Sequence, residues 1–357
     1  MNKYKKKKVG ILTLPSAHNY GWALQLWALY TFLELQGYDP IVIDRRWNND
    51  NRGLIYCIKR FLYKYLLCYS FTSFIKRNFN KTNEIRDSKK LKDLNLDVYI
   101  VGSDQIWRIE HTRGAELNFF LDFLEDDETP IRISYAASFG TDQWKGTNIE
   151  TKQVAKLLKK FDLISVREDS GVELCKNIFN ISNAYCVLDP TLLIKPEKYN
   201  DLIKINHNTK KDFLVTYLLD FNKEKEFFVD RFSEYVGLNT IHLYSKKNTP
   251  YCIYGSISNW LQKIHDAKYV IVDSFHGMCF AIIFKKNFIV IANEKRGLTR
   301  FTSLLSKLNL KDRIIYHPTS FSFDLLLKSI DYDDVYKRLE QHQLYSKNLL
   351  LNVLNSK

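Results

Sequence analysis

A histidine placed at the start of an apolar helix is the clearest chemical signal in this sequence. Residues 273–277 read DSFHG, between the strand-like segment YVIV (269–272) and the apolar run FAIIF (280–284). The N–H groups and the dipole at a helix N-terminus favour bound anions. We therefore predict that His276 acts on an anionic ligand. The alternative is that His276 only caps the helix.

Further polar side chains follow the other segments that read as strands. In open parallel sheets, ligands bind outside the carboxyl ends of the strands, so the residues at those ends are candidates for a site. In the N-terminal half these residues are His18, Asn19, Asp104, Gln105, Ser138, Arg167 and Glu168. In the C-terminal half they are Asp273, Ser274, His276, Asn293, Lys295, Arg296 and Arg300.

Several of these residues also have a structural interpretation. Asn19 is a natural N-cap for the helix that follows it, and Asp104 and Gln105 can cap the next segment in the same way. Arg167 and Glu168 together can fix the start of a helix. Both interpretations remain open for these positions.

The elements that must position these residues alternate between strand and helix. The apolar run 8–14 leads into a helix over 20–35, which is hydrophobic almost all round, and then into a strand over 40–44. This βαβ pattern predicts a parallel sheet covered on both faces. Further strands are predicted at 97–102, 132–138, 163–168, 212–219, 240–245, 269–273 and 288–292.

The alternation restarts near Asp189-Pro190 and predicts two domains. We place an N-terminal Rossmann-like domain over 1–188, a second over 189–330 that carries the DSFHG motif, and a C-terminal helix over 331–357. The fold class is therefore α/β, with two doubly wound domains facing a cleft. A chain of 357 residues with 45% hydrophobic residues is large enough for two such cores.

Residues 52–81 interrupt this alternation with a basic, aromatic-rich segment. It has seven Lys or Arg, no Asp or Glu, and a helical projection with one apolar and one basic side. Such a helix suits peripheral contact with an anionic membrane surface, although a helix docked on the protein explains the pattern equally well. The net charge of +13 favours an anionic partner. Nucleic acid is not expected, because no nucleic-acid motif accompanies the charge.

The remaining composition points to a cytoplasmic protein without a metal. Six scattered cysteines form no CxxC pair, and no Asp and His cluster has metal-ligand spacing. No apolar stretch reaches the roughly 18 residues of a membrane span.

Six sequence blocks resemble the polysaccharide pyruvyl transferase family. In order they are NYGWALQLWAL, VGSDQIW, ISYAASFG, ISVRE, LDPTLL and DSFHGMCFAIIF. They fall between about residues 9 and 310, which is most of the chain, whereas 52–81 and the C-terminal tail lie outside the pattern. Each block is weak evidence by itself, but six in the right order are fairly specific. The resemblance implies two Rossmann-like domains similar to those of GT-B glycosyltransferases, in agreement with the alternation.

The resemblance also implies a reaction. Members of this family move the enolpyruvyl group of phosphoenolpyruvate onto a sugar as a pyruvate ketal, with phosphoenolpyruvate as a substrate and no cofactor. The acceptor implied is a sugar of a surface polysaccharide or of its lipid-linked precursor. By position in the family motif, His276 is the general acid or a phosphate contact. The implied donor contacts are Arg167, Ser274, Gly277, Lys295 and Arg296, and the candidate acceptor contacts are His18, Asn19, Asp104 and Gln105.

One departure from the family pattern leaves alternatives open. Many members have Arg two residues before the histidine, where this chain has Ser274. A missing cation weakens anion binding by on the order of 1.5–3 kcal/mol, unless Arg296 or Arg300 replaces it. Otherwise the donor differs. The alternative functions are a glycosyltransferase that uses a nucleotide sugar, and a non-catalytic scaffold protein.

Overall fold

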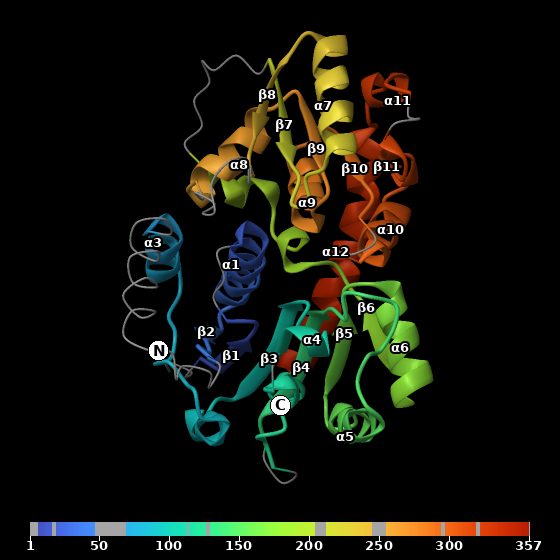
Figure 1. Cartoon of the computed structure of the whole chain (residues 1–357). Helices are drawn as coiled ribbons and strands as arrows, with labels where there is room; N and C mark the ends of the chain where they lie inside the picture. Colours follow the sequence, from blue (N-terminus) through green and yellow to red (C-terminus); the bar gives the residue numbers. More distant parts are fainter. Residues whose placement is uncertain are drawn as a thin grey trace, which may run out of the picture. The chain divides into compact units, whose positions relative to one another are not determined.

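The computed structural model describes the chain as two compact α/β units (Figure 1). It describes residues 6–15, 19–46, 69–112, 114–125, 129–203, 212–244, 255–293, 297–318 and 322–356. Of these, the first unit takes the parts within 1–53, 75–194 and 340–357, and the second takes 69–74 and the parts within 195–339. The contacts thus divide the chain after Ile194, whereas the sequence placed the boundary after residue 188.

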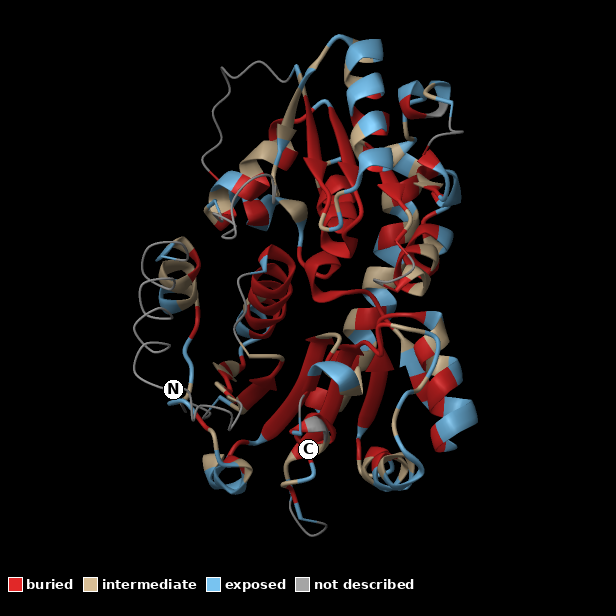
Figure 2. Ribbon diagram, in the orientation of Figure 1, coloured by how far each residue is buried: buried red, intermediate tan, exposed pale blue. Residues whose placement is uncertain are grey.

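The first unit is built on a six-stranded parallel sheet. The strand order is β2-β1-β3-β4-β5-β6, and Val9 of β1 pairs with Val98 of β3 while Ile133 of β4 pairs with Leu163 of β5. The central strands β3 to β5 are almost wholly buried because helices cover the sheet, which explains their nearly continuous apolar sequences (Figure 2). The strands are β1 (Lys8–Leu12), β2 (Asp39–Val42), β3 (Val98–Asp104), β4 (Ile131–Ala137), β5 (Leu163–Val166) and β6 (Ala184–Cys186).

Among the described helices of the first unit, α1 is the most deeply buried (Figure 2). Its N-cap is Asn19, whose side-chain oxygen accepts a hydrogen bond from the backbone N–H of Trp22 at 3.2 Å. The cap was one of the two interpretations left open for Asn19, and the structure confirms it. The helices are α1 (Tyr20–Leu35), α3 (Tyr69–Asn78, in part), α4 (Ile109–Thr112), α5 (Asn148–Leu158), α6 (Asp169–Phe179) and the C-terminal part of α12 (Tyr332–Leu354).

The end of the chain is fixed to the first unit by hydrogen bonds. The Tyr38 hydroxyl donates to Asn355 at 2.7 Å, and the backbone N–H of Leu188 donates to the Ser346 hydroxyl at 3.1 Å. The Gln343 amide donates to the carbonyl of Leu192 at 2.6 Å. The second half of α12 therefore belongs to the first unit although it follows the second unit in sequence.

The second unit has a five-stranded parallel sheet in the order β11-β10-β9-β7-β8. Its strands are β7 (Phe213–Tyr217), β8 (Asn239–His242), β9 (Tyr269–Val272), β10 (Asn287–Ile291) and β11 (Ile314–Ile315). Its helices are α7 (Lys223–Val236), α8 (Ile257–Asp266), α9 (Phe275–Ile283), α10 (Leu298–Lys307), α11 (Asp324–Leu327) and the first part of α12. Both sheets are parallel, so the predicted α/β class with two doubly wound units is confirmed.

The sequence analysis did not predict two short edge strands, and part of the predicted basic segment lies outside the described residues. Strands β6 and β11 have only three and two residues, too few to show a hydrophobic pattern. Of the segment 52–81, residues 52–68 lie outside the described residues, and the rest forms α3 followed by an extended stretch. In the described part of the chain, each helix is too short or too polar to cross a bilayer.

Gly102, near the end of β3, is predicted to be intolerant of any side chain. It has a φ of 130°, and a Cβ there would lie 2.1 Å from the carbonyl oxygen of Tyr135 on β4. We expect Gly102→Ala to lower the free energy of unfolding by about 3 kcal/mol or more, from strain plus overpacking. Gly37→Ala is the matched control, because its φ of 87° is also positive but nothing lies within 4 Å. It should cost only about 1–2 kcal/mol. If urea denaturation showed that both variants lose the same free energy of unfolding, the steric explanation for Gly102 would be wrong.

Candidate functional site

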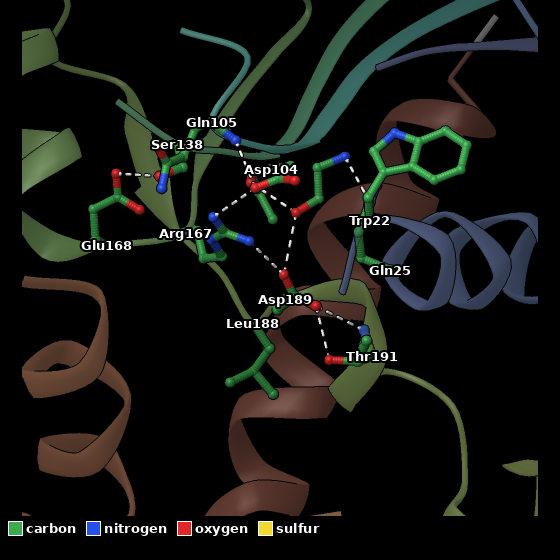
Figure 3. A network of polar contacts seen from close by, with 12 residues as sticks. Trp22, Gln25, Asp104, Gln105, Ser138, Arg167, Glu168, Leu188, Asp189 and Thr191 are labelled. Atoms are coloured by element: carbon green, nitrogen blue, oxygen red, sulfur yellow. Dashed lines mark hydrogen bonds and ion pairs between the residues drawn. The ribbon is translucent and has the colours of Figure 1, made fainter. Parts of the chain in front are cut away.

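Arg167 links the ends of three strands in the first unit (Figure 3). It follows β5, and its guanidinium lies between Asp189, which follows β6, at 2.9 Å, and Asp104, at the end of β3, at 3.5 Å. The Arg167 and Asp189 side chains have 0% exposure. Burial by itself lowers the pKa of Arg167, but the nearby carboxylates outweigh this and raise its pKa above the ordinary value. The Arg167 guanidinium therefore stays protonated and pairs with both carboxylates.

Asp189 is saturated with hydrogen bonds at the start of the next segment. One of its oxygens accepts from the Thr191 N–H at 3.0 Å and from the Thr191 hydroxyl at 2.8 Å. The other accepts from Arg167 and from the Ser103 hydroxyl at 3.2 Å. The backbone N–H of Ser103 donates in turn to Gln25 of α1 at 3.1 Å. The motif LDPTLL thus contributes a carboxylate that ties β3, β5 and α1 together.

Glu168 has a role that the sequence did not reveal. It stands at the N-cap position of α6, but its side chain makes no cap hydrogen bond. Instead one carboxylate oxygen accepts from the Ser138 hydroxyl and the Phe139 N–H, both at 2.9 Å, in the loop after β4. The motifs ISYAASFG and ISVRE are therefore partners in space. A single sequence carries no signal for this pairing, because the two residues are 30 positions apart.

Asp104 is the member of this network that reaches solvent. Its φ is 81°, its side chain is 15% exposed, and one oxygen accepts from the Gln105 N–H at 2.9 Å. Gln105 lies against Gly140, where an added Cβ would come within 2.8 Å of the Gln105 amide oxygen. Both predicted acceptor contacts are thus at the carboxyl edge of the sheet, as is Asn19 after β1.

In the second unit, a carboxylate organises the corresponding edge. Asp273 follows β9, has 0% exposure, and accepts from the backbone N–H groups of Leu219 at 2.6 Å and Asp220 at 3.1 Å. It also pairs with Lys225 of α7 at 2.6 Å. Asp220 accepts from the Asn293 amide, after β10, at 2.6 Å. Two carboxylates therefore connect the ends of β7, β9 and β10.

His276 stands in the first turn of α9, at the edge organised by Asp273. Ser274 is the N-cap, and its hydroxyl accepts from the Gly277 N–H at 3.5 Å. The His276 side chain is nearly buried, with 7% exposure for the residue, and its ring meets Phe275 edge-on at 5.5 Å. The guanidinium of Arg300, in the first turn of α10, lies over the same Phe275 ring at 5.7 Å. An imidazole and a guanidinium thus flank one phenyl ring at the start of two helices.

Gly277 stands where α9 packs closely on the sheet. A Cβ at this position would lie 2.9 Å from Val272 of β9 and 3.1 Å from Tyr217 of β7. Only glycine lets α9 approach the sheet so closely, and this approach sets the position of His276. The structure therefore places Ser274 and Gly277 as the residues that shape the helix start.

The predicted site residues divide between the two units. Arg167, Asp104, Gln105 and Asn19 belong to the first unit, and His276, Ser274 and Gly277 to the second. His18, Lys295 and Arg296 lie outside the described residues. Within the described ranges, His, Cys, Asp and Glu side chains form no group that could hold a metal ion.

Comparison with protein families decides the relationship of this chain. The model of the polysaccharide pyruvyl transferase family matches residues 19–295, which is more than half of the sequence. The chain belongs to the polysaccharide pyruvyl transferase family. The match spans the Arg167 network and the DSFHG motif, and it ends five residues before Arg300. A search of curated proteins gives no significant match.

Solved structures show that this pyruvyl transferase family member has a GT-B-like fold. A Listeria monocytogenes protein described as a UDP-N-acetylglucosamine 2-epimerase has a TM-score of 0.53 at 9% identity, covering 95% of this chain and 91% of its own. MnaA from S. aureus, solved with UDP, has a TM-score of 0.51 at 12% identity with the same coverage. The N-terminal domain of Candida albicans trehalose-6-phosphate phosphatase has a TM-score of 0.54 at 12% identity, covering 99% and 98%. At such low identity the likeness concerns the fold.

Removal of the Arg167 guanidinium is expected to destabilise the first unit strongly. Arg167→Met leaves two carboxylates facing each other in a buried site, which should cost about 3–5 kcal/mol. Arg108→Met is the matched control, because Arg108 pairs with Glu110 at 2.9 Å near the surface and should cost less than about 1 kcal/mol. Urea denaturation compares the two variants. Similar stability of both would show that the buried pair does not hold the strand ends.

The Lys225–Asp273 pair is expected to matter in the same way for the second unit. Lys225→Met keeps the length of the buried side chain but leaves the Asp273 carboxylate without its cation, at a cost of about 3 kcal/mol. Lys198→Met breaks an exposed pair with Asp201 and should change the free energy of unfolding by less than about 1 kcal/mol. Thermal denaturation followed by circular dichroism measures both. A Lys225→Met variant as stable as the control would refute the role of Asp273 as an organising carboxylate.

Proposed function

We propose that this protein transfers the enolpyruvyl group of phosphoenolpyruvate to a sugar and forms a pyruvate ketal. The observation that supports the proposal most directly is the cluster of His276 and Arg300 around Phe275, at the start of two helices, within or beside the region matched by the family model. Phosphoenolpyruvate carries a phosphate and a carboxylate, and helix N-termini with a guanidinium bind such groups.

The reaction requires one proton donor and two acceptor hydroxyls. Protonation of C3 turns the double bond into a methyl group and makes C2 electrophilic. One sugar hydroxyl adds to C2, the C2–O bond to phosphate breaks, and a second hydroxyl closes the ketal. Two hydroxyl protons are released, one replaces the proton used at C3 and one leaves with the phosphate. An imidazole is the side chain best suited to deliver a proton near neutral pH, and we assign this role to His276.

Arg300 is the cation proposed to replace the arginine that this chain lacks at position 274. Ser274 caps α9, and its hydroxyl carries no charge that could replace the missing guanidinium. Arg300 is buried and lies one phenyl ring away from His276. Guanidinium groups hold carboxylates and phosphates through two parallel hydrogen bonds. Lys295 and Arg296 precede Arg300 in sequence and stay predicted donor contacts.

The first unit is proposed to receive the acceptor. Asp104 and Gln105 are placed at its sheet edge, and we propose that they and His18 contact acceptor hydroxyls. Because Arg167 is buried between Asp189 and Asp104, the geometry favours a positioning role for it over direct contact with the donor.

A surface polysaccharide or its lipid-linked precursor is the proposed acceptor class. Peripheral contact of 52–81 with an anionic membrane, on the cytoplasmic side, also stays a prediction.

His276→Ala and Arg300→Ala test the proposed chemistry. We expect His276→Ala to bind phosphoenolpyruvate but to lower transfer of its labelled carbon to polysaccharide by about 10²-fold or more. Arg300→Ala should weaken phosphoenolpyruvate binding by roughly 10-fold or more, the loss of a charged hydrogen bond. Isothermal titration calorimetry and isotope incorporation are the measurements. His265→Ala, at the end of α8, is the matched control and should behave as the wild type.

Three outcomes would contradict this proposal. A folded His276→Ala variant with full transfer activity would remove His276 from the mechanism. Unchanged donor affinity in Arg300→Ala would remove Arg300 from the donor site. Binding of a UDP-sugar without binding of phosphoenolpyruvate would replace the proposal by a glycosyltransferase function.

A further inference from the structure

A concave surface lies on the second unit, away from the strand ends that carry His276. It is a cavity of about 550 Å³ between α7 and the segment around α11. Its described lining residues are Phe227, Phe228, Arg231, Glu234, Tyr235, Pro318, Ser322, Phe323 and Asp324. Lys225 of α7 pairs with Asp273. On a helical projection, most of the lining residues that α7 contributes lie on the side of the helix opposite Lys225. The cavity and the His276 cluster therefore use different faces of the unit.

Aromatic rings form the walls of this cavity. Phe227 and Tyr235 are 53% and 56% exposed, which is unusual for such large side chains. They are eight residues apart on α7, or about 12 Å along the helix axis. Phe323 fixes the floor, since its ring lies 5.6 Å from that of Phe228 and 5.4 Å from that of Tyr235. The rings of Phe228, Phe323 and Tyr235 are thus packed together before any ligand arrives, which reduces the entropy lost on binding.

Polar groups of both signs stand among these rings. The Arg231 guanidinium lies 5.7 Å from the centre of the Phe227 ring, and Glu234 and Tyr235 follow it along the same face. On the opposite wall the Ser322 hydroxyl donates to Asp324 at 2.9 Å. The cavity therefore offers hydrogen-bond donors and acceptors together with apolar ring faces.

The charge of this lining argues against an anionic ligand. The described lining has one cation, Arg231, against two carboxylates, Glu234 and Asp324, although the whole chain has a net charge of +13. A phosphate or an acidic polymer would meet net repulsion here. A sugar ring has an apolar C–H face for stacking and hydroxyls that both donate and accept, so it matches the aromatic and polar groups.

We propose that this cavity binds one or two neutral sugar units of a polysaccharide. That this polysaccharide is the acceptor of the reaction rests on the proposed function. A polymeric acceptor extends beyond the sugar that reacts, so a second part of the protein can bind it. Phe227 and Tyr235 offer stacking faces for pyranose rings at the two ends of the cavity, and Arg231, Glu234 and Asp324 bind sugar hydroxyls. The cavity holds the polymer by residues that take no part in the transfer of the enolpyruvyl group.

Saturation-transfer NMR with the full chain, in the absence of phosphoenolpyruvate, tests this proposal. The probes are maltohexaose, cellohexaose, chitohexaose and xylohexaose, which differ in linkage but all present apolar C–H faces. We expect transfer to ring C–H protons of at least one probe at millimolar concentration. The double variant Phe227→Ala/Tyr235→Ala should bind at least tenfold more weakly. Tyr185→Ala, which removes an exposed tyrosine from β6 of the first unit, is the matched control and should bind normally.

Each contrary result has a distinct meaning. Absence of transfer to all four probes would overturn the proposal, since stacking on aromatic rings does not depend on one linkage. Equal affinity of the double variant and the wild type would show that binding occurs elsewhere. Loss of binding on addition of phosphoenolpyruvate would place the sugar at the donor site instead. The double variant should retain its affinity for phosphoenolpyruvate, so the failure of this proposal and that of the proposed function can be told apart.

Discussion

A buried guanidinium between two carboxylates is the interaction on which the first unit's strand-end loops depend. Parallel strands bring all their carboxyl ends to one edge of a sheet, and the loops there carry polar groups that lose water on folding. Arg167 pairs with both Asp189 and Asp104, and each carboxylate in turn accepts hydrogen bonds from backbone or hydroxyl groups of its own or a neighbouring segment. Charged hydrogen bonds thus hold the ends of β3 and β5 to the segment after β6, while the Asp104 side chain stays partly exposed to solvent.

The second unit solves the same problem with the charges reversed. A carboxylate, Asp273, is at the centre, and a lysine and two backbone N–H groups surround it. This arrangement uses one cation, Lys225, to hold the carboxylate, and places His276 and Arg300 near the same Phe275 ring. Burial by itself does not separate the two kinds of residue, since all of them are more than nine-tenths buried. What separates them is the kind of neighbour: Lys225 pairs with a carboxylate, whereas His276 and Arg300 both lie against the Phe275 ring.

The start of α9 departs from a pattern that many members of the family share. The family arginine before the histidine is absent here, and the serine in its place completes the helix cap. A cation from the next helix, α10, approaches the same phenyl ring. The two helix N-termini converge because β9 and β10 are neighbours in the sheet. A guanidinium from the start of one helix therefore lies at the same edge of the sheet as the start of the other.

The sequence by itself determined most of the elements, the α/β class and the family, because apolar periodicity and short motifs are local properties. The bounds of α1 agree with the predicted 20–35, and DSFHG proves to be a strand end, a cap and a helix start. Only the tertiary structure decided which of the polar strand-end residues are partners. Arg167 with Asp189, Glu168 with Ser138 and Lys225 with Asp273 are separated by 22, 30 and 48 positions. Their pairing follows from the order of strands in the sheets, and strand order is a global property that no local pattern encodes.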